Sequence, residues 1–81
     1  MYALGVKSDI QAKGVGRQLM TFIEQLLQEN GERILIVETS GAADFEKSRT
    51  FYESLNYTKE AVIRDIWSDG DDKVVYWKKL Q

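Results

Sequence analysis

The chain has 81 residues, a formal net charge of −2, and neither cysteine nor histidine. A chain of this length forms one small domain, which buries only about 60% of the surface that the unfolded chain exposes. Without cysteine there is no disulfide framework or thiolate metal site, and without histidine the commonest general base and metal ligand is missing. Acid–base chemistry must therefore use carboxylates, lysine, tyrosine or water, and we expect no bound metal.

The distribution of charged and apolar residues excludes two further classes of partner. No basic stripe runs along the chain, which argues against nucleic acid because such binding depends on clustered cations. No apolar run approaches the roughly 18 residues of a membrane span, and no signal-peptide pattern opens the chain. We therefore expect a cytoplasmic protein with no membrane partner.

The first half of the chain predicts a strand, a helix and a second strand. Met1–Val6 is a short apolar run typical of a strand buried on both faces, although such a strand needs a neighbour on each side. Between Arg17 and Asn30, apolar residues recur every three or four positions, which predicts an amphipathic helix that closes at Gly31. Its apolar side comprises Leu19, Ile23, Leu26 and Leu27, flanked by Met20 and Phe22. The aliphatic run Ile34–Val37 is typical of a buried parallel strand.

The second half predicts one helix and a β-hairpin. Asp44 is placed to cap a helix over Phe45–Leu55, and Asn56 can close it in the left-handed conformation. Two strand-like runs follow, Glu60–Trp67 and Lys73–Leu80. The turn between them contains Asp-Gly, a strong hairpin signal, and we interpret its aspartates as solvated because their spacing fits no metal-binding loop. The predicted fold is α/β, a mixed sheet in the order β-α-β-α-β-β within one domain, residues 1–81.

The turn between the first strand and the first helix carries two glycines in Gln11-Ala12-Lys13-Gly14-Val15-Gly16. The first N–H groups of a helix have no partner within it and carry partial positive charge, so they readily bind anions. Gly14 and Gly16 let an anion approach the backbone closely. Lys13 and Arg17 either assist the anion or are simply solvated. Two glycines alone fit an ordinary strand-to-helix turn equally well.

A second segment makes the two-glycine turn a more specific signal than it is alone. Gln11-Ala12-Lys13-Gly14-Val15-Gly16 is similar to the acyl-CoA signature of the GNAT (Gcn5-related N-acetyltransferase) superfamily, Gln/Arg-x-x-Gly-x-Gly/Ala. Phe51–Tyr57 looks like the family's Tyr-x-x-x-Gly-Phe/Tyr segment, with Asn56 in place of the usual glycine. The chain thus resembles the C-terminal half of the GNAT fold. The resemblance implies a core that lacks the family's N-terminal strands and helices, so that the chain is expected to be shortened at its N-terminus.

The resemblance also implies a site. Acetyl-CoA is the expected co-substrate, with its pyrophosphate on the turn and its pantetheine arm against the backbone of Val6. The implied cofactor-binding residues are Val6, Gln11, Ala12, Lys13, Gly14, Val15, Gly16 and Arg17. Tyr52 aligns with a tyrosine that protonates the leaving thiolate in many members, and Glu38 stands where some members place the base. As purely structural residues, Tyr52 would pack in the core and Glu38 would bond nearby N–H groups or a lysine.

Three functions remain open at this point. The first is an N-acetyltransferase that moves an acetyl group from acetyl-CoA to a primary amine by direct attack. The second is a non-catalytic CoA-binding or interaction module derived from such an enzyme. The third, a phosphate-binding domain of unrelated function, leaves the tyrosine segment unexplained. Because the first strand has an open edge, we also expect a homodimer or another association through that strand or the C-terminal hairpin.

Overall fold

The computed structural model describes residues 1–5 and 15–81, with Val15 described by its backbone alone. The described residues form one four-stranded sheet in the order β1-β2-β4-β3. The strands are β1 (Tyr2–Gly5), β2 (Ile34–Ser40), β3 (Thr58–Ser68) and β4 (Asp71–Lys79). β1 runs parallel to β2, and β4 runs antiparallel to β2 and β3. The predicted mixed sheet is confirmed.

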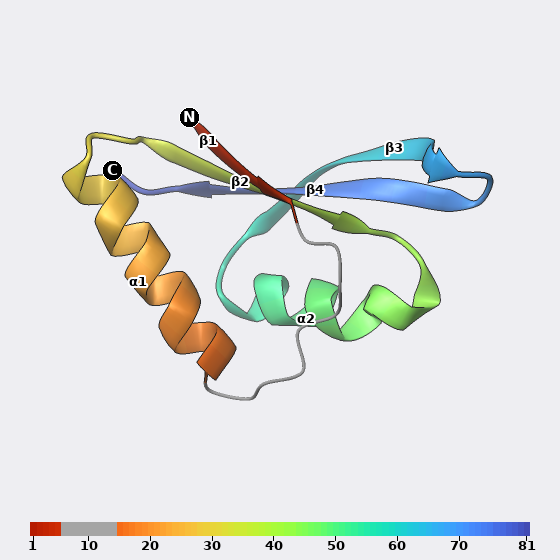
Figure 1. The fold of residues 1–81 in the computed structure, drawn as a ribbon, viewed down its shortest axis with the longest axis horizontal. Helices are drawn as coiled ribbons and strands as arrows, with labels where there is room; N and C mark the ends of the chain where they lie inside the picture. The colour runs from red at the N-terminus through yellow and green to blue at the C-terminus, as the bar shows by residue number, and fades with distance from the viewer. Residues whose placement is uncertain (6–14) are drawn as a thin grey trace.

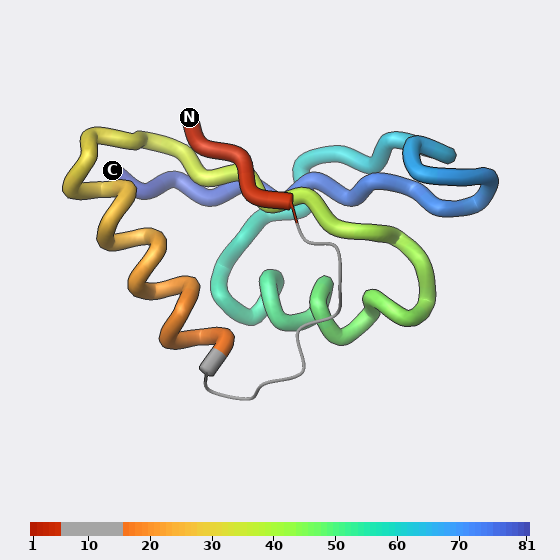
Figure 2. Tube along the Cα trace, in the orientation of Figure 1, coloured from red at the N-terminus to blue at the C-terminus, as the bar shows by residue number. Residues whose placement is uncertain are grey.

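Two α-helices cover the same face of the sheet (Figure 1). They are α1 (Val15–Glu29) and α2 (Glu46–Ser54), and a short 3-10 helix, η1 (Ala43–Phe45), leads into α2. Both crossovers, from β1 to β2 and from β2 to β3, move in the same direction across the sheet, and right-handed connections then place both helices on one side. The turn of the β3–β4 hairpin projects beyond both helices (Figure 2).

The core lies between the helices and the two central strands. On β2, Leu35, Val37 and Thr39 are completely buried. Val37 is level with Tyr76 of β4, which is also completely buried, so these side chains share the face that the helices cover. The buried hydrophobic residues are Met20, Leu27, Leu35, Val37, Tyr52, Leu55, Tyr57, Val74, Tyr76 and Leu80.

The expectation that the first strand is buried on both faces is wrong. β1 pairs with β2 from Tyr2↔Leu35 to Gly5↔Glu38, and among the described residues no strand pairs with its other side. Three of its four residues are exposed, and only Leu4 packs against the core. A strand at the edge of a sheet loses the neighbour that would bury it, which is the physical reason for the difference.

The apolar side of α1 is broader than the part that the sheet covers. Met20 and Leu27 are buried, and Ile23 packs against them. Leu19, Phe22 and Leu26 lie on the same helix but are 56%, 53% and 48% exposed. The predicted amphipathic helix is therefore present, but only part of its apolar side faces the core.

Two of the three residues predicted to close or cap the helices have the predicted role, and the third does not. Gly31 (φ 82°) and Asn56 (φ 70°) both adopt the left-handed conformation predicted for the residues that close the helices. Asp44 does not cap the second helix, because it lies inside η1 and α2 begins at Glu46 without a side-chain cap. Instead, the Arg49 guanidinium donates hydrogen bonds to the carbonyls of Ser40 (2.7 Å) and Ala42 (2.8 Å), which fixes α2 against the end of β2.

Three aspartates of the hairpin accept hydrogen bonds at its bends. The Asp65 carboxylate accepts a hydrogen bond from the Gly70 N–H (2.8 Å), and the Asp72 carboxylate accepts one from the Asp65 N–H (3.0 Å). Asp65 itself has a positive φ of 55°, at an irregular stretch of the β3–β4 pairing. The Ser40 hydroxyl donates to the Asp71 carboxylate (2.5 Å). The hairpin is confirmed. Asp69 is exposed, as expected of a solvated turn, whereas Asp71 and Asp72 are half-buried and also accept hydrogen bonds.

A polar cluster joins α1, the end of α2 and β4. The Tyr57 hydroxyl donates to the Glu24 carboxylate (2.5 Å), and the Lys78 ammonium lies 3.2 Å from the same carboxylate. Lys78 also donates to the Leu55 carbonyl at 3.0 Å and stands 5.0 Å from the centre of the Tyr57 ring. Both charged side chains of the ion pair are largely removed from water. The cluster therefore sets how α1 and α2 sit on the sheet.

We expect Lys78→Met to lower the free energy of unfolding by about 2 kcal/mol at pH 7, because it leaves the Glu24 carboxylate without its cation in a partly buried position. The matched control is Lys73→Met, which removes a longer and more exposed ion pair with Glu38 (3.4 Å) and should cost less than about 1 kcal/mol. Urea unfolding followed by circular dichroism measures both. Equal losses for the two variants would contradict the role given to the cluster.

Candidate functional site

The N-terminal end of α1 is the described part of the predicted anion site. Gly16 is buried and Arg17 is exposed in the first turn, which contains no acidic residue. The partial positive charge of this helix end is therefore not offset by a carboxylate of its own turn. Val6, Gln11, Ala12, Lys13 and Gly14 lie outside the described residues, so their predicted roles stay predictions.

A groove of about 680 Å³ runs along α2, on the same side of the sheet as the start of α1 (Figure 1). Its lining residues are Ala43, Asp44, Glu46, Lys47, Thr50, Phe51 and Ser54. The sequence analysis did not identify this groove. The signal was present in the spacing, because Lys47, Thr50 and Ser54 recur every three or four residues and so share one side of a helix. The groove combines a cation, two carboxylates, two hydroxyl groups and an aromatic ring.

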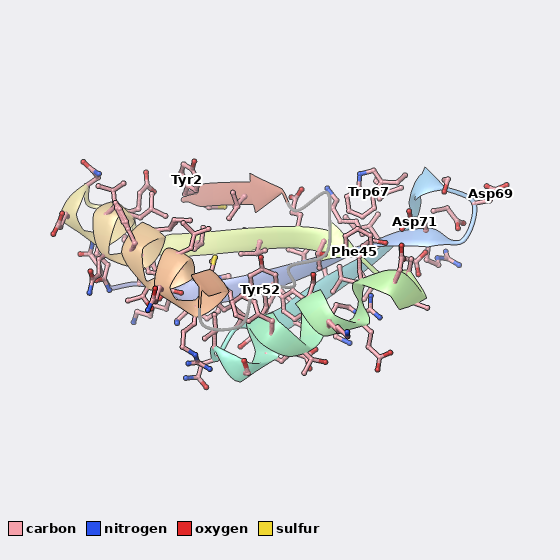
Figure 3. All side chains as sticks on the ribbon, turned by 60° about the horizontal axis from the view of Figure 1, so that its bottom comes forward. Tyr2, Phe45, Tyr52, Trp67, Asp69 and Asp71 are labelled. Carbon is pink, nitrogen blue, oxygen red and sulfur yellow. The ribbon has the colours of Figure 1, made fainter. Side chains whose placement is uncertain are left out.

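Tyr52 lies next to this groove in sequence but points into the core. Its side chain is only 1% exposed, and Figure 3 shows it between the helices and the sheet. Its ring centre lies 5.2 Å from that of Phe51, 5.7 Å from that of Tyr57 and 6.1 Å from that of Tyr76. Burial raises the pKa of Tyr52 to about 12, because the phenolate would lose its hydration. At neutral pH this phenol is therefore protonated.

The hydroxyl of Tyr52 differs from those of the two tyrosines beside it. Tyr57 donates to Glu24, and Tyr76 donates to Glu53 at 2.8 Å. Burial comes first and the hydrogen-bonded carboxylate second among the causes that raise the pKa of each of these phenols above the usual value. Within the described part of the chain, the Tyr52 hydroxyl makes no hydrogen bond to a protein group. Of the three buried phenols, it is the one that donates no hydrogen bond to a described residue.

Glu38 lies on the opposite face of the sheet from Tyr52. It alternates with Val37, whose side chain faces the helices, and its carboxylate lies 3.4 Å from the Lys73 ammonium. The structure therefore pairs Glu38 with a lysine and does not bring it together with Tyr52 on one face. Glu38 is nevertheless level with Gly5, the last described residue of β1.

One buried polar group at this end of β2 has no partner. The Thr39 hydroxyl oxygen is buried and makes no hydrogen bond, as judged over residues 1–5 and 15–81. A buried polar group left unpaired costs about 1–3 kcal/mol. The sequence analysis did not single out Thr39, because nothing in its neighbours marks it as different from any strand threonine.

The three buried tyrosines predict a loss of stability in alkali. Their phenols stay protonated in the folded protein well above pH 10, whereas in the unfolded chain they ionise near pH 10. The unfolded state then binds fewer protons, so stability is unaffected by these groups below pH 10 and falls above it. The slope is about 1.4 kcal/mol per pH unit for each phenol that ionises only on unfolding.

Urea midpoints measured from pH 8 to pH 11.5 test this prediction, with phenolate absorbance at 295 nm recorded in the same samples. The absorbance of the buried phenols should rise together with unfolding. Tyr2→Phe serves as the background for this measurement, because Tyr2 is 44% exposed and its absorbance would otherwise be counted with that of the buried phenols. If the phenolate absorbance of this variant rose near pH 10 while the circular dichroism spectrum stayed native, the tyrosine cluster would not be closed to ionisation.

Within residues 1–5 and 15–81 there is no cluster of acidic side chains that could hold a metal ion. In the same part of the chain, neither helix is long and apolar enough to cross a membrane.

Comparisons with known proteins give one family. Residues 1–59 match the family model of the GNAT acetyltransferase domain. A search of curated proteins gave no match. Among solved structures, a protein described as an acetyltransferase of the GNAT family from Desulfovibrio desulfuricans superposes with a TM-score of 0.83 at 34% identity, over 88% of this chain and 45% of its own.

Two more distant structures share the fold. An aminoglycoside 6'-N-acetyltransferase in complex with coenzyme A has a TM-score of 0.77 at 14% identity, over 88% of this chain and 52% of its own. A protein from Salmonella typhimurium described as an acetyltransferase, with acetyl-CoA, has a TM-score of 0.75 at 19% identity, over 89% of this chain and 42% of its own. This chain spans about half the length of the solved structures that it matches.

Proposed function

This chain belongs to the GNAT family of acetyltransferases, and from that we propose that it transfers an acetyl group from acetyl-CoA to a primary amine by direct attack. The observation that carries the proposal is the family match over residues 1–59, which includes both Gln11–Gly16 and Tyr52. We propose that residues 1–81 act as one acyl-CoA-binding unit and that the protein is cytoplasmic.

The proposed cofactor site begins at the N-terminal end of α1. Backbone N–H groups there would bind the pyrophosphate, because they lack partners inside the helix and carry partial positive charge. Arg17 and Lys13 would add full positive charges, and the backbone of Val6 would bind the pantetheine arm. The remaining residues assigned to this site are Gln11, Ala12, Gly14, Val15 and Gly16. The groove along α2, with Lys47 and Thr50, supports the proposal because it offers further polar contacts on the same side of the sheet.

We expect coenzyme A to bind the wild-type chain and Gly16→Val to weaken that binding at least about tenfold, because a branched side chain would hold the phosphate oxygens away from the backbone. Isothermal titration measures the affinity. The matched control is Ala61→Val, which adds the same side chain on the exposed strand β3 and should leave the affinity unchanged. Absence of binding to the folded wild-type chain would overturn the proposed function.

Tyr52 is the proposed acid. The departing CoA thiolate must gain a proton. A phenol whose pKa is about 12 can give its proton to a thiolate whose thiol has a pKa near 8.5 only if the charge that develops in the transition state brings the two pKa values together. The Tyr52 phenol is protonated at neutral pH and forms no hydrogen bond with the described residues, so its proton is available to a ligand. A ligand at the ends of β1 and β2 would also give the unpaired Thr39 hydroxyl a partner.

Glu38 is the proposed base, acting on the amine through water. A thioester held beside Gly5 and Glu38 would lie between the two faces of the sheet, and so within reach of groups on both. The Lys73 ammonium lies 3.4 Å from the Glu38 carboxylate and competes with a cationic amine for it. This competition is the observation that favours the alternative, a CoA-binding module without turnover.

We expect Tyr52→Phe to lower kcat at least about tenfold while coenzyme A affinity stays within twofold, since the hydroxyl acts on the leaving group rather than on the bound cofactor. Thiol release from acetyl-CoA in the presence of a panel of primary amines measures the rate. Tyr57→Phe is the matched control, because it removes a buried hydroxyl of the same cluster that already donates to Glu24. It should lower stability and leave the turnover of the folded protein unchanged.

Two results would decide against parts of this mechanism. Equal turnover by the wild type and Tyr52→Phe would reject the acid role of Tyr52. Binding of coenzyme A without thiol release for any amine in the panel would favour the non-catalytic module over the enzyme.

A further inference from the structure

The ion pair between Glu38 and Lys73 uses only part of its hydrogen-bonding capacity. The Lys73 ammonium lies 3.4 Å from Oε1 of Glu38, whereas a charge-assisted N–H···O bond usually measures about 2.7–2.9 Å. Over residues 1–5 and 15–81, Oε2 of Glu38 accepts no hydrogen bond and the ammonium donates no second one. Because an ammonium has three donors and a carboxylate accepts at both oxygens, each partner can bind a further charged group.

The ion pair between Glu24 and Lys78 has no such spare capacity. The Lys78 ammonium donates to both oxygens of Glu24, at 3.2 Å each, and to the Leu55 carbonyl at 3.0 Å. The Tyr57 hydroxyl donates to the same carboxylate. Water does not explain the difference, because the Lys73 side chain, at 21% exposed, is no more open to solvent than that of Lys78 at 25%. The unsaturated pair is therefore the one suited to bind a ligand.

The sheet register places this pair at the proposed site of acetyl transfer. Glu38 is level with Gly5, beside which the thioester is proposed to lie. Lys73 is level with Ser40, two residues beyond Glu38, so both charged side chains are on one face. Asp71, two residues before Lys73 on β4, accepts a hydrogen bond from the Ser40 hydroxyl instead. An amine that reaches the Glu38 carboxylate therefore meets the Lys73 ammonium next.

The charges of this pair discriminate between kinds of amine. A plain cationic amine on Glu38 would place two cations on one partly buried carboxylate, and the like charges would repel each other. An amine with its own carboxylate supplies the missing anion. In an α-amino acid the nitrogen and the carboxylate oxygens are about 3 Å apart by standard bond lengths. That distance is close to the 3.4 Å between Lys73 Nζ and Glu38 Oε1, so the four groups can form a ring of alternating charge.

We propose that the acceptor is an α-amino acid, with its ammonium on Glu38 and its carboxylate on Lys73. The proposal rests on the proposed function, because it names the primary amine of the same reaction. The amine nitrogen bonds to the acetyl carbon as the carbon–sulfur bond breaks. The ammonium loses two protons in all: one ends in water by way of Glu38, and the other balances the proton that Tyr52 gives to the thiolate. Lys73 stays charged and determines specificity.

Thiol release from acetyl-CoA, measured with a panel of α-amino acids and their amides, tests the proposal. Each amide keeps the side chain and the amino group but lacks the negative charge, as a protein N-terminus does. The wild type should prefer the best amino acid over its amide at least about tenfold in kcat/KM, mainly through KM, because the carboxylate contact persists into the transition state. The amide is the less basic amine, so a bias from free-amine concentration would favour the amide.

Lys73→Met should reduce this preference to within about threefold, because the amino acid loses its cation and the amide no longer competes for Glu38. The matched control is Lys59→Met, which removes an exposed ammonium on the other face of the sheet and should keep the preference. Circular dichroism checks that both variants are folded. Equal wild-type rates for acids and amides, or a preference that survives Lys73→Met, would overturn this proposal alone. No thiol release with any acceptor would overturn the proposed turnover and this proposal together.

Discussion

The structure depends on burying three tyrosines where both helices meet the sheet. Tyr52, Tyr57 and Tyr76 provide the largest side chains of a small core, and their rings contact one another at 5.7 and 6.1 Å. Tyr57 and Tyr76 donate hydrogen bonds to Glu24 and Glu53, so they can be buried without an unpaired polar group. The first bond joins α1 to the residue before β3, and the second joins α2 to β4.

The same cluster connects the core with the proposed chemistry. A buried phenol without a carboxylate partner lowers the stability of the core. Its hydroxyl proton, however, remains available for transfer to a ligand. Tyr52 is in this state among the described residues, and the α2 groove lies beside it. Glu38 lies on the other face of the sheet, bound to Lys73. The proposed acid and base therefore lie on different faces of the sheet.

The sequence by itself determined the order of the elements and the residues that close both helices. Periodicity, Gly31, Asn56 and the Asp-Gly turn are local signals, and local backbone preferences suffice to place them. It also pointed to the family through Gln11–Gly16 and Tyr52. That Leu19 and Leu26 stay exposed, and that Glu38 faces away from Tyr52, could be learned only from the packing of the helices on the sheet. Those features depend on which strands become neighbours, and a residue's own segment carries no information about its distant partners.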